Sequence, residues 1–155
     1  MAKSQWYEGI NGKASHLVYL NSKALELKKL VSNEKTMIIR GAAGKKSPLG
    51  GRAKVGDDLY FVETGKHLLV THKAVISKVV ESDKMTFEES VDFVKHYEKQ
   101  LNLSKDQFER YAGKKYLAVY EVESMTAIDS FTYHRTSNMD DWVIVDDINK
   151  IKVES

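Results

Sequence analysis

The 155-residue sequence contains no cysteine, one proline and no long apolar segment. Without cysteine, the chain has no disulfide, no thiolate nucleophile and no cysteine-ligated zinc. Its longest aliphatic runs, such as Leu68-Leu69-Val70, are far too short to span a bilayer, and residues 1–6 lack the apolar core of a signal peptide. We therefore expect no membrane association and a cytoplasmic location.

The charge is nearly balanced over the whole chain but uneven along it. The net charge is +2, yet residues 1–54 carry 11 Lys and Arg against 3 Asp and Glu, which is +8. Residues 55–155 carry 13 against 19, which is −6. A segregated cationic half is what an anionic partner requires. The alternative is that the lysines serve only to solvate a small domain.

Size and composition predict one domain. A hydrophobic content of 42% with 30% charged residues is ordinary for a globular protein, and no repeat or low-complexity tract interrupts the chain. We expect a single α+β domain over residues 1–155, in which residues 1–14 form an N-terminal extension.

Apolar periodicity predicts the order of the elements. We expect strands near 16–20, 36–40, 58–63, 67–80, 116–123 and 127–134, and helices near 23–32, 87–101 and 104–113. Residues 140–153 are predicted to form either a strand or a short helix.

Local signals support several of these boundaries. Asn21-Ser22 is a suitable N-cap for the first helix, and Thr86-x-x-Glu89 and Ser104-x-x-Gln107 are capping boxes for the later ones. Residues 64–66 are expected to form a hairpin turn between two strands. The second of those strands is long, so we expect a bend or bulge near residues 71–73.

The segment 33–61 organises the sequence. Lys35-Thr36-Met37-Ile38-Ile39-Arg40 follows the first predicted helix, a loop rich in glycine and cations spans 41–54, and Gly56-Asp57 precedes the next strand. This pattern resembles the ASCH family of the PUA-like superfamily, whose signature is Gly-x-Lys-x-x-Glu-x-Arg followed by a Gly-Asp turn. Lys35 and Arg40 match its lysine and arginine. Asn33 replaces the glycine, and both residues tolerate a left-handed backbone.

The resemblance implies a fold and a binding site. The fold would be a PUA-like mixed β-barrel flanked by helices, with the motif beside a cleft between the first helix and the barrel. Lys35 and Arg40 would then meet a ligand at the centre of this cleft. The alternative is that the two cations pair with acids such as Asp57 or Asp58.

The glycine-rich loop is the second candidate for ligand contact. It does not fit the phosphate-binding Walker pattern, because Ile39 stands five positions before Gly44 and Lys45 is followed by another lysine. Exposed N–H groups and cations in such a loop can still hold a phosphate backbone. The residues expected to contact phosphates are Lys45, Lys46, Arg52 and Lys54.

Aromatic residues are candidates for stacking on a base, because PUA-like proteins that bind nucleic acids commonly hold a base against aromatic side chains. Tyr133 adjoins His134 and Arg135, which places a ring and a cation near one loop. We therefore add Tyr133 and Arg135 to the predicted ligand-binding residues. Further candidate walls are Tyr19, Tyr60 and Trp142, although each of these aromatic residues could instead belong to the core.

Catalysis is the main alternative to binding. Some ASCH members are amidohydrolases that act on acetylated cytidine, with the motif lysine, a nearby threonine and a later glutamate. Here Ile38 occupies the threonine position, Thr36 lies two residues earlier, and Glu121 or Glu123 would have to supply the glutamate. The mechanism thus lacks a hydroxyl at its expected place.

The histidines show no metal-ligand spacing, and we expect no metal and no cofactor. The prediction is thus an RNA- or nucleotide-binding module. An amidohydrolase on a modified nucleoside, using Lys35, is one alternative, and a protein-interaction module is another. The sequence does not indicate an oligomeric state.

Overall fold

The computed structural model describes residues 15–42, 53–63, 69–133 and 142–145. These ranges hold six strands and four helices. The strands are β1 (Ser15–Leu20), β2 (Met37–Ala42), β3 (Asp58–Glu63), β4 (Leu69–Glu81), β5 (Tyr116–Thr132) and β6 (Trp142–Val145). The helices are α1 (Glu26–Val31), α2 (Phe87–His96), α3 (Glu98–Leu101) and α4 (Lys105–Tyr111).

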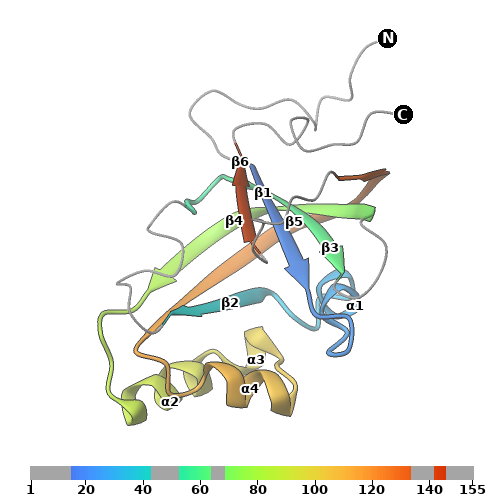
Figure 1. Cartoon of the computed structure of the whole chain (residues 1–155). Coiled ribbons are helices and arrows are strands. Elements are labelled where there is room, and N and C mark those ends of the chain that lie inside the picture. Colours follow the sequence, from blue (N-terminus) through green and yellow to red (C-terminus); the bar gives the residue numbers. More distant parts are fainter. Residues whose placement is uncertain (1–14, 43–52, 64–68, 134–141, 146–155) are drawn as a thin grey trace.

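The strands form one mixed sheet in the order β2-β5-β4-β3-β1-β6. β1 runs parallel to β3, and the other neighbouring pairs are antiparallel. Figure 1 shows a strongly curved sheet, with α2, α3 and α4 together beside β2 and with α1 near the ends of β1 and β3. The predicted α+β fold with a mixed sheet and flanking helices is confirmed.

The expected closure of the barrel is not seen. In the described part of the chain β2 and β6 are the sheet edges, and no strand pairing joins β1 to β2. The guanidinium of Arg40 spans this seam instead, because Nη1 donates to Ile39 O at 2.8 Å and Nη2 donates to Tyr19 O at 2.9 Å. A side chain thus links β1 and β2 where we expected a ladder.

The core explains the apolar runs of the sequence. All six residues of β1 are buried, as its continuous apolar pattern predicted. Along β2 the side chains alternate, as in any strand. Ile38 belongs to a cluster inside the curved sheet, whereas Met37 and Ile39 pack toward the helices. Both faces of β2 are therefore covered, which fixes the register of the motif.

Two strand predictions need correction. The expected strands 116–123 and 127–134 are one 17-residue strand, β5, in which Ser124 adopts a left-handed φ of 58°. A serine tolerates this single kink while the strand continues its pairing with β4. In β4 the register shifts between Val70 and His72, which confirms the expected bulge, and it shifts twice more further along.

Both capping boxes are confirmed. The expected helix 87–101 is divided into α2 and α3, because Tyr97 leaves helical geometry with φ −103° and ψ 15°. The first helix starts at Glu26 rather than at residue 23. Leu25 is left-handed there, and Asn21 Oδ1 caps the preceding turn by accepting from Ala24 N at 3.0 Å.

At the C-terminal end, β6 occupies residues 142–145 of the segment predicted as strand or helix, so the strand alternative holds there. None of the helices in the described ranges is long and apolar enough to cross a membrane.

Candidate functional site

Lys35 lies two residues before β2 and is buried, with 1% of its surface exposed. Asn33 precedes it with a φ of 66°, as expected for a residue at a glycine position. Lys35 Nζ lies 3.5 Å from Glu26 Oε2 and donates a hydrogen bond to Leu101 O. Lys35 thus faces an acid, as the alternative supposed, but the acid is Glu26 and not Asp57 or Asp58.

The end of α3 forms the other half of this lysine's surroundings. Leu101 O accepts from Lys35, Asn102 O accepts from Lys29 Nζ at 2.9 Å, and Asn102 Nδ2 donates to Glu34 O at 3.1 Å. The carbonyl end of a helix carries partial negative charge, which favours cations. Sequence reasoning missed these contacts because they join residues that are more than 60 positions apart.

Burial lowers the pKa of Lys35 from 10.5 to about 8. Desolvation is the largest cause, since it penalises the charged amine, and the positive charges of Arg40 and Lys29 act in the same direction. The carboxylate of Glu26 opposes the shift by favouring the ammonium form. The amine is therefore easier to deprotonate than an ordinary lysine.

A small pocket of about 60 Å³ opens where α1, β1, β2 and α4 meet. It lies beside the first helix, where the resemblance places a cleft. Its lining residues are mostly polar: Tyr19, Asn21, Glu26, Arg40, Gln107, Arg110 and Tyr111. Arg40 thus lines the pocket, whereas Lys35 stands behind Glu26 and is not among these residues.

The lining side chains differ in depth. Glu26 and Arg40 are buried, at 5% and 8% exposure, while Arg110 is exposed. The Arg110 guanidinium lies 5.5 Å from the centre of the Tyr111 ring, in a cation–π contact. The pocket therefore presents one carboxylate and one guanidinium in its interior and a second guanidinium at the surface.

The Gly-Asp turn is built around a second buried pair. Gly56 has a φ of 94°, and Asp57 Oδ2 lies 2.9 Å from His16 Nε2 and accepts from Lys54 N at 3.0 Å. His16 was set aside at the sequence level because it has no metal-ligand spacing. His16 directly precedes the apolar run Leu17–Leu20, and a histidine buried with such a run needs a polar partner, so that signal was available in the sequence.

The remaining predicted ligand residues are only partly described. Lys54 is exposed. Tyr133 is 1% exposed, and its ring packs edge-on against Tyr19 at 5.9 Å. Lys45, Lys46, Arg52 and Arg135 lie outside the described residues. Tyr60, a further candidate wall, is 1% exposed in the same apolar cluster as Tyr133.

Among the described residues, the contacts found for the Lys35 amine are Glu26 and Leu101 O, and neither Thr36 nor Glu121 is one of them. Ile38 is fully buried in the apolar cluster inside the sheet and offers no hydroxyl. Thr36 binds neighbouring segments through its backbone, since its N–H donates to Gln100 O and its carbonyl accepts from Val122 N. Glu121 lies on β5 opposite Met37, where Ser77 Oγ donates to its backbone carbonyl at 3.2 Å.

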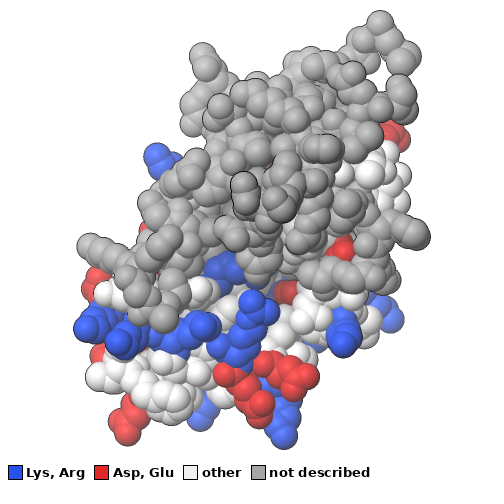
Figure 2. All heavy atoms as spheres, in the orientation of Figure 1, with Lys and Arg blue, Asp and Glu red and all other residues white. Residues whose placement is uncertain are grey.

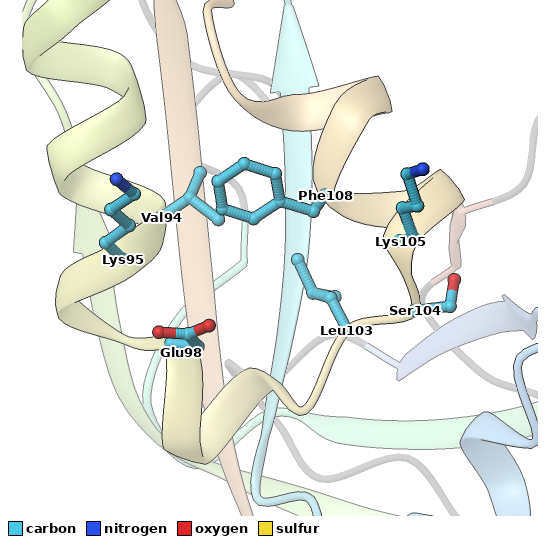
Figure 3. Close-up of a pocket in the computed structure, with 7 residues that line it drawn as sticks. All are labelled: Val94, Lys95, Glu98, Leu103, Ser104, Lys105 and Phe108. Atoms are coloured by element: carbon cyan, nitrogen blue, oxygen red, sulfur yellow. The ribbon is translucent and has the colours of Figure 1, made fainter.

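A larger hollow of about 280 Å³ lies between α2 and α4. Figure 3 shows Val94 and Phe108 pointing toward one another across it, with Leu103 below them and with Lys95 and Lys105 on opposite sides. None of the predicted site residues lines this hollow. Its apolar side chains pack against the helix-side cluster of the core.

The fold matches that of solved structures of one kind. Solved structures with this fold include the ASCH protein from Zymomonas mobilis and two single-residue variants of it, at 16–17% identity and TM-scores of 0.54–0.56. The matches cover 75–76% of this chain and 71–75% of the other. No family model matches the sequence, and no curated protein does. The chain therefore has the fold of these ASCH structures, as the resemblance of its motif implied.

Proposed function

We propose that this protein binds RNA or a nucleotide in the pocket between α1 and the sheet. The observation that carries the proposal is the set of side chains around the pocket, namely two guanidiniums, a carboxylate, a primary amide and two tyrosines. Guanidiniums bind phosphates and base acceptors, and carboxylates and amides bind base edges. The fold shared with the Zymomonas ASCH protein is consistent with this use.

The size of the pocket indicates how a ligand enters. A volume of about 60 Å³ is well below the roughly 300–1,000 Å³ of a pocket that encloses a small molecule. A nucleotide would therefore insert the edge of its base and leave the sugar and phosphate outside. Arg110, exposed beside Tyr111, is suitably placed for such an outer phosphate.

Long-range charge supports an anionic ligand. Residues 1–54 carry a net charge of +8, and Figure 2 shows basic side chains in a row above the helical end of the molecule on the face in view. We assign the outer phosphate contacts to Lys45, Lys46, Arg52 and Lys54. Arg135 remains a proposed contributor to the same ligand surface, whereas Tyr133, 1% exposed in an apolar cluster, is left out of it.

The test is binding of a fluorescent single-stranded RNA, measured by anisotropy at several salt concentrations. Replacing Lys45, Lys46, Arg52 and Lys54 together with alanine is expected to weaken binding and to flatten the slope of log K against log salt by about 0.7 per lost contact. Lys84→Ala, an exposed lysine next to α2, is the matched control. Equal binding by wild type and the quadruple variant would contradict the role of the loop.

The lowered pKa of Lys35, about 8, favours the enzymatic alternative. An amine with a lowered pKa is a better nucleophile or base at neutral pH. Its burial and the apolar Ile38 argue against turnover, so we expect no release of cytidine from acetylcytidine above background. If chromatography detects cytidine release by the wild type and none by Lys35→Ala, the protein is an amidohydrolase and the binding proposal is wrong.

A further inference from the structure

Glu26 is the single acid among the described residues that line the pocket. It is the first residue of α1, and it is buried although it carries a carboxylate. Buried carboxylates are costly unless they are paired and hydrogen-bonded. Because burying this carboxylate is unfavourable, we asked whether Glu26 contributes to ligand recognition in the pocket.

The orientation of the Glu26 carboxylate is fixed by two neighbours, Asn21 and Lys35, before any ligand binds. Its Oε1 accepts from Asn21 N at 2.8 Å, and its Oε2 lies 3.5 Å from Lys35 Nζ. The turn that supplies Asn21 N is itself held by the Asn21 side chain, which accepts from Ala24 N. The carboxylate is therefore preorganised, so a ligand need not pay to order it.

The Glu26 carboxylate can accept further hydrogen bonds, whereas the guanidinium of Arg40 already uses some of its N–H donors. Each carboxylate oxygen accepts about two hydrogen bonds, and one partner per oxygen is seen here. Both terminal nitrogens of Arg40 already donate to backbone carbonyls across the seam. A group that enters the pocket and donates N–H to Glu26 is thus better matched than one that brings a further acceptor.

We infer that Glu26 makes this pocket selective for a nucleobase that carries an exocyclic amino group. The inference rests on the proposed nucleotide-binding function and adds the chemical class of the base. The amino group of cytosine or adenine would donate to Glu26 in the pocket. Uracil places a carbonyl oxygen at the position where cytosine has its amino group, and this oxygen would face the lone pairs of the carboxylate. Lys35 acts as a positioning residue, since it holds Glu26 from behind without lining the pocket.

Cytosine and uracil are matched in size, so they make the sharpest pair of probes. Anisotropy titrations would compare ten-nucleotide oligocytidylate, oligoadenylate and oligouridylate at one salt concentration. Wild type is expected to bind the first two about 10-fold more tightly than oligouridylate, as for one good base contact. Glu26→Gln keeps the acceptor for Asn21 N but adds an N–H donor, so it should reduce the preference to about twofold or less.

Two further variants separate recognition from folding. Glu34→Gln makes the same chemical change on an exposed glutamate near the motif, and it should leave the preference unchanged. Glu26→Gln combined with Lys35→Met removes both members of the buried pair, and it should also lose the preference while keeping the circular dichroism of the folded protein.

The binding measurements distinguish a failure of the Glu26 inference from a failure of the proposed function. A wild-type protein that binds the three oligonucleotides equally, or a Glu26→Gln variant that keeps the wild-type preference, would overturn the role of Glu26 and leave nucleotide binding in place. A wild-type protein that binds none of them would overturn the proposed function itself.

Discussion

Two buried pairs, each made of a basic and an acidic side chain, lie at the two ends of the segment 33–61, and they contact different parts of the molecule. In the first, Lys35 and Glu26 meet beside a pocket, and the carboxylate lines that pocket. In the second, Asp57 Oδ2 contacts His16 and also holds the backbone N–H of Lys54 in the Gly-Asp turn. The first pair thus stands at the proposed ligand site, whereas the second holds the Gly-Asp turn.

The largest expected effect comes from breaking the second pair. Asp57→Ala removes the acceptor for Lys54 N and leaves His16 buried at 0% exposure without this partner. We expect the free energy of unfolding to fall by about 3–5 kcal/mol, as when one member of a buried pair is removed. Urea denaturation of the wild type and the variant measures this directly. A loss below 1 kcal/mol would place His16–Asp57 among the dispensable contacts.

The next effect concerns the first pair and depends on pH. Between pH 8 and about 10.5, folded Lys35 is neutral while unfolded lysine still binds a proton, so the unfolded state takes up more protons. The stability of the wild type relative to Lys35→Met should therefore rise with pH across this window. A pKa shift from 10.5 to about 8 corresponds to roughly 3 kcal/mol over the full window.

The measurement is a set of denaturant titrations of both proteins at half-unit intervals from pH 7.5 to 10. Lys35→Met also removes the partner of Glu26, so the comparison rests on the slope of the stability difference with pH and not on its baseline. A difference that is flat with pH would mean that Lys35 keeps an ordinary affinity for its proton.

A smaller effect is expected at the mouth of the pocket. Arg110 is exposed and contacts Tyr111, so Arg110→Ala should leave the fold intact. Loss of its contact with a ligand phosphate should weaken RNA binding by about 1 kcal/mol, near fivefold, which is the upper end for a solvent-exposed ion pair. Anisotropy titration against Lys84→Ala supplies the comparison. Unchanged binding with an unchanged salt slope would place the ligand elsewhere.

The smallest effect is expected from replacing the Lys54 side chain, which tests whether Asp57 depends only on the backbone N–H of Lys54. Asp57 holds Lys54 through the backbone N–H, while the Lys54 side chain is exposed. Lys54→Ala should therefore change the free energy of unfolding by less than about 0.5 kcal/mol. The same variant should lower the salt slope of RNA binding by about 0.7, as for one single-strand contact. A large loss of stability would contradict the division of roles between the two pairs.

Local signals in the sequence predicted most of the fold. Thr86 and Ser104 cap their helices as expected, and the unbroken apolar run of β1 is buried on both faces. Each of these depends on neighbouring residues, which pattern reasoning handles well. The kink at Ser124 and the break at Tyr97 were missed, because a single residue leaving its backbone region has no periodic signature.

The site was predicted less completely than the fold. The motif led to Arg40, which lines the pocket, and to Lys35, which stands behind it. Glu26, Gln107 and Arg110 were not proposed as site residues, because they come from helices brought to the motif by tertiary packing. Glu26 carried a faint signal, since an acid facing the buried lysine had to exist somewhere.

The position of β1 in the sheet has a consequence for synthesis of the chain. Ser15 pairs with Asp58 on one side and with Val145 on the other, so the two partners of one residue are far apart in the sequence. At roughly 5–20 residues per second, a ribosome needs about 7–26 s to make the residues between Ser15 and Val145. During that interval the apolar strand has one open edge, which is a template for wrong pairing. β6 thus acts as a late cover, and folding of this strand is completed only when translation has passed residue 145.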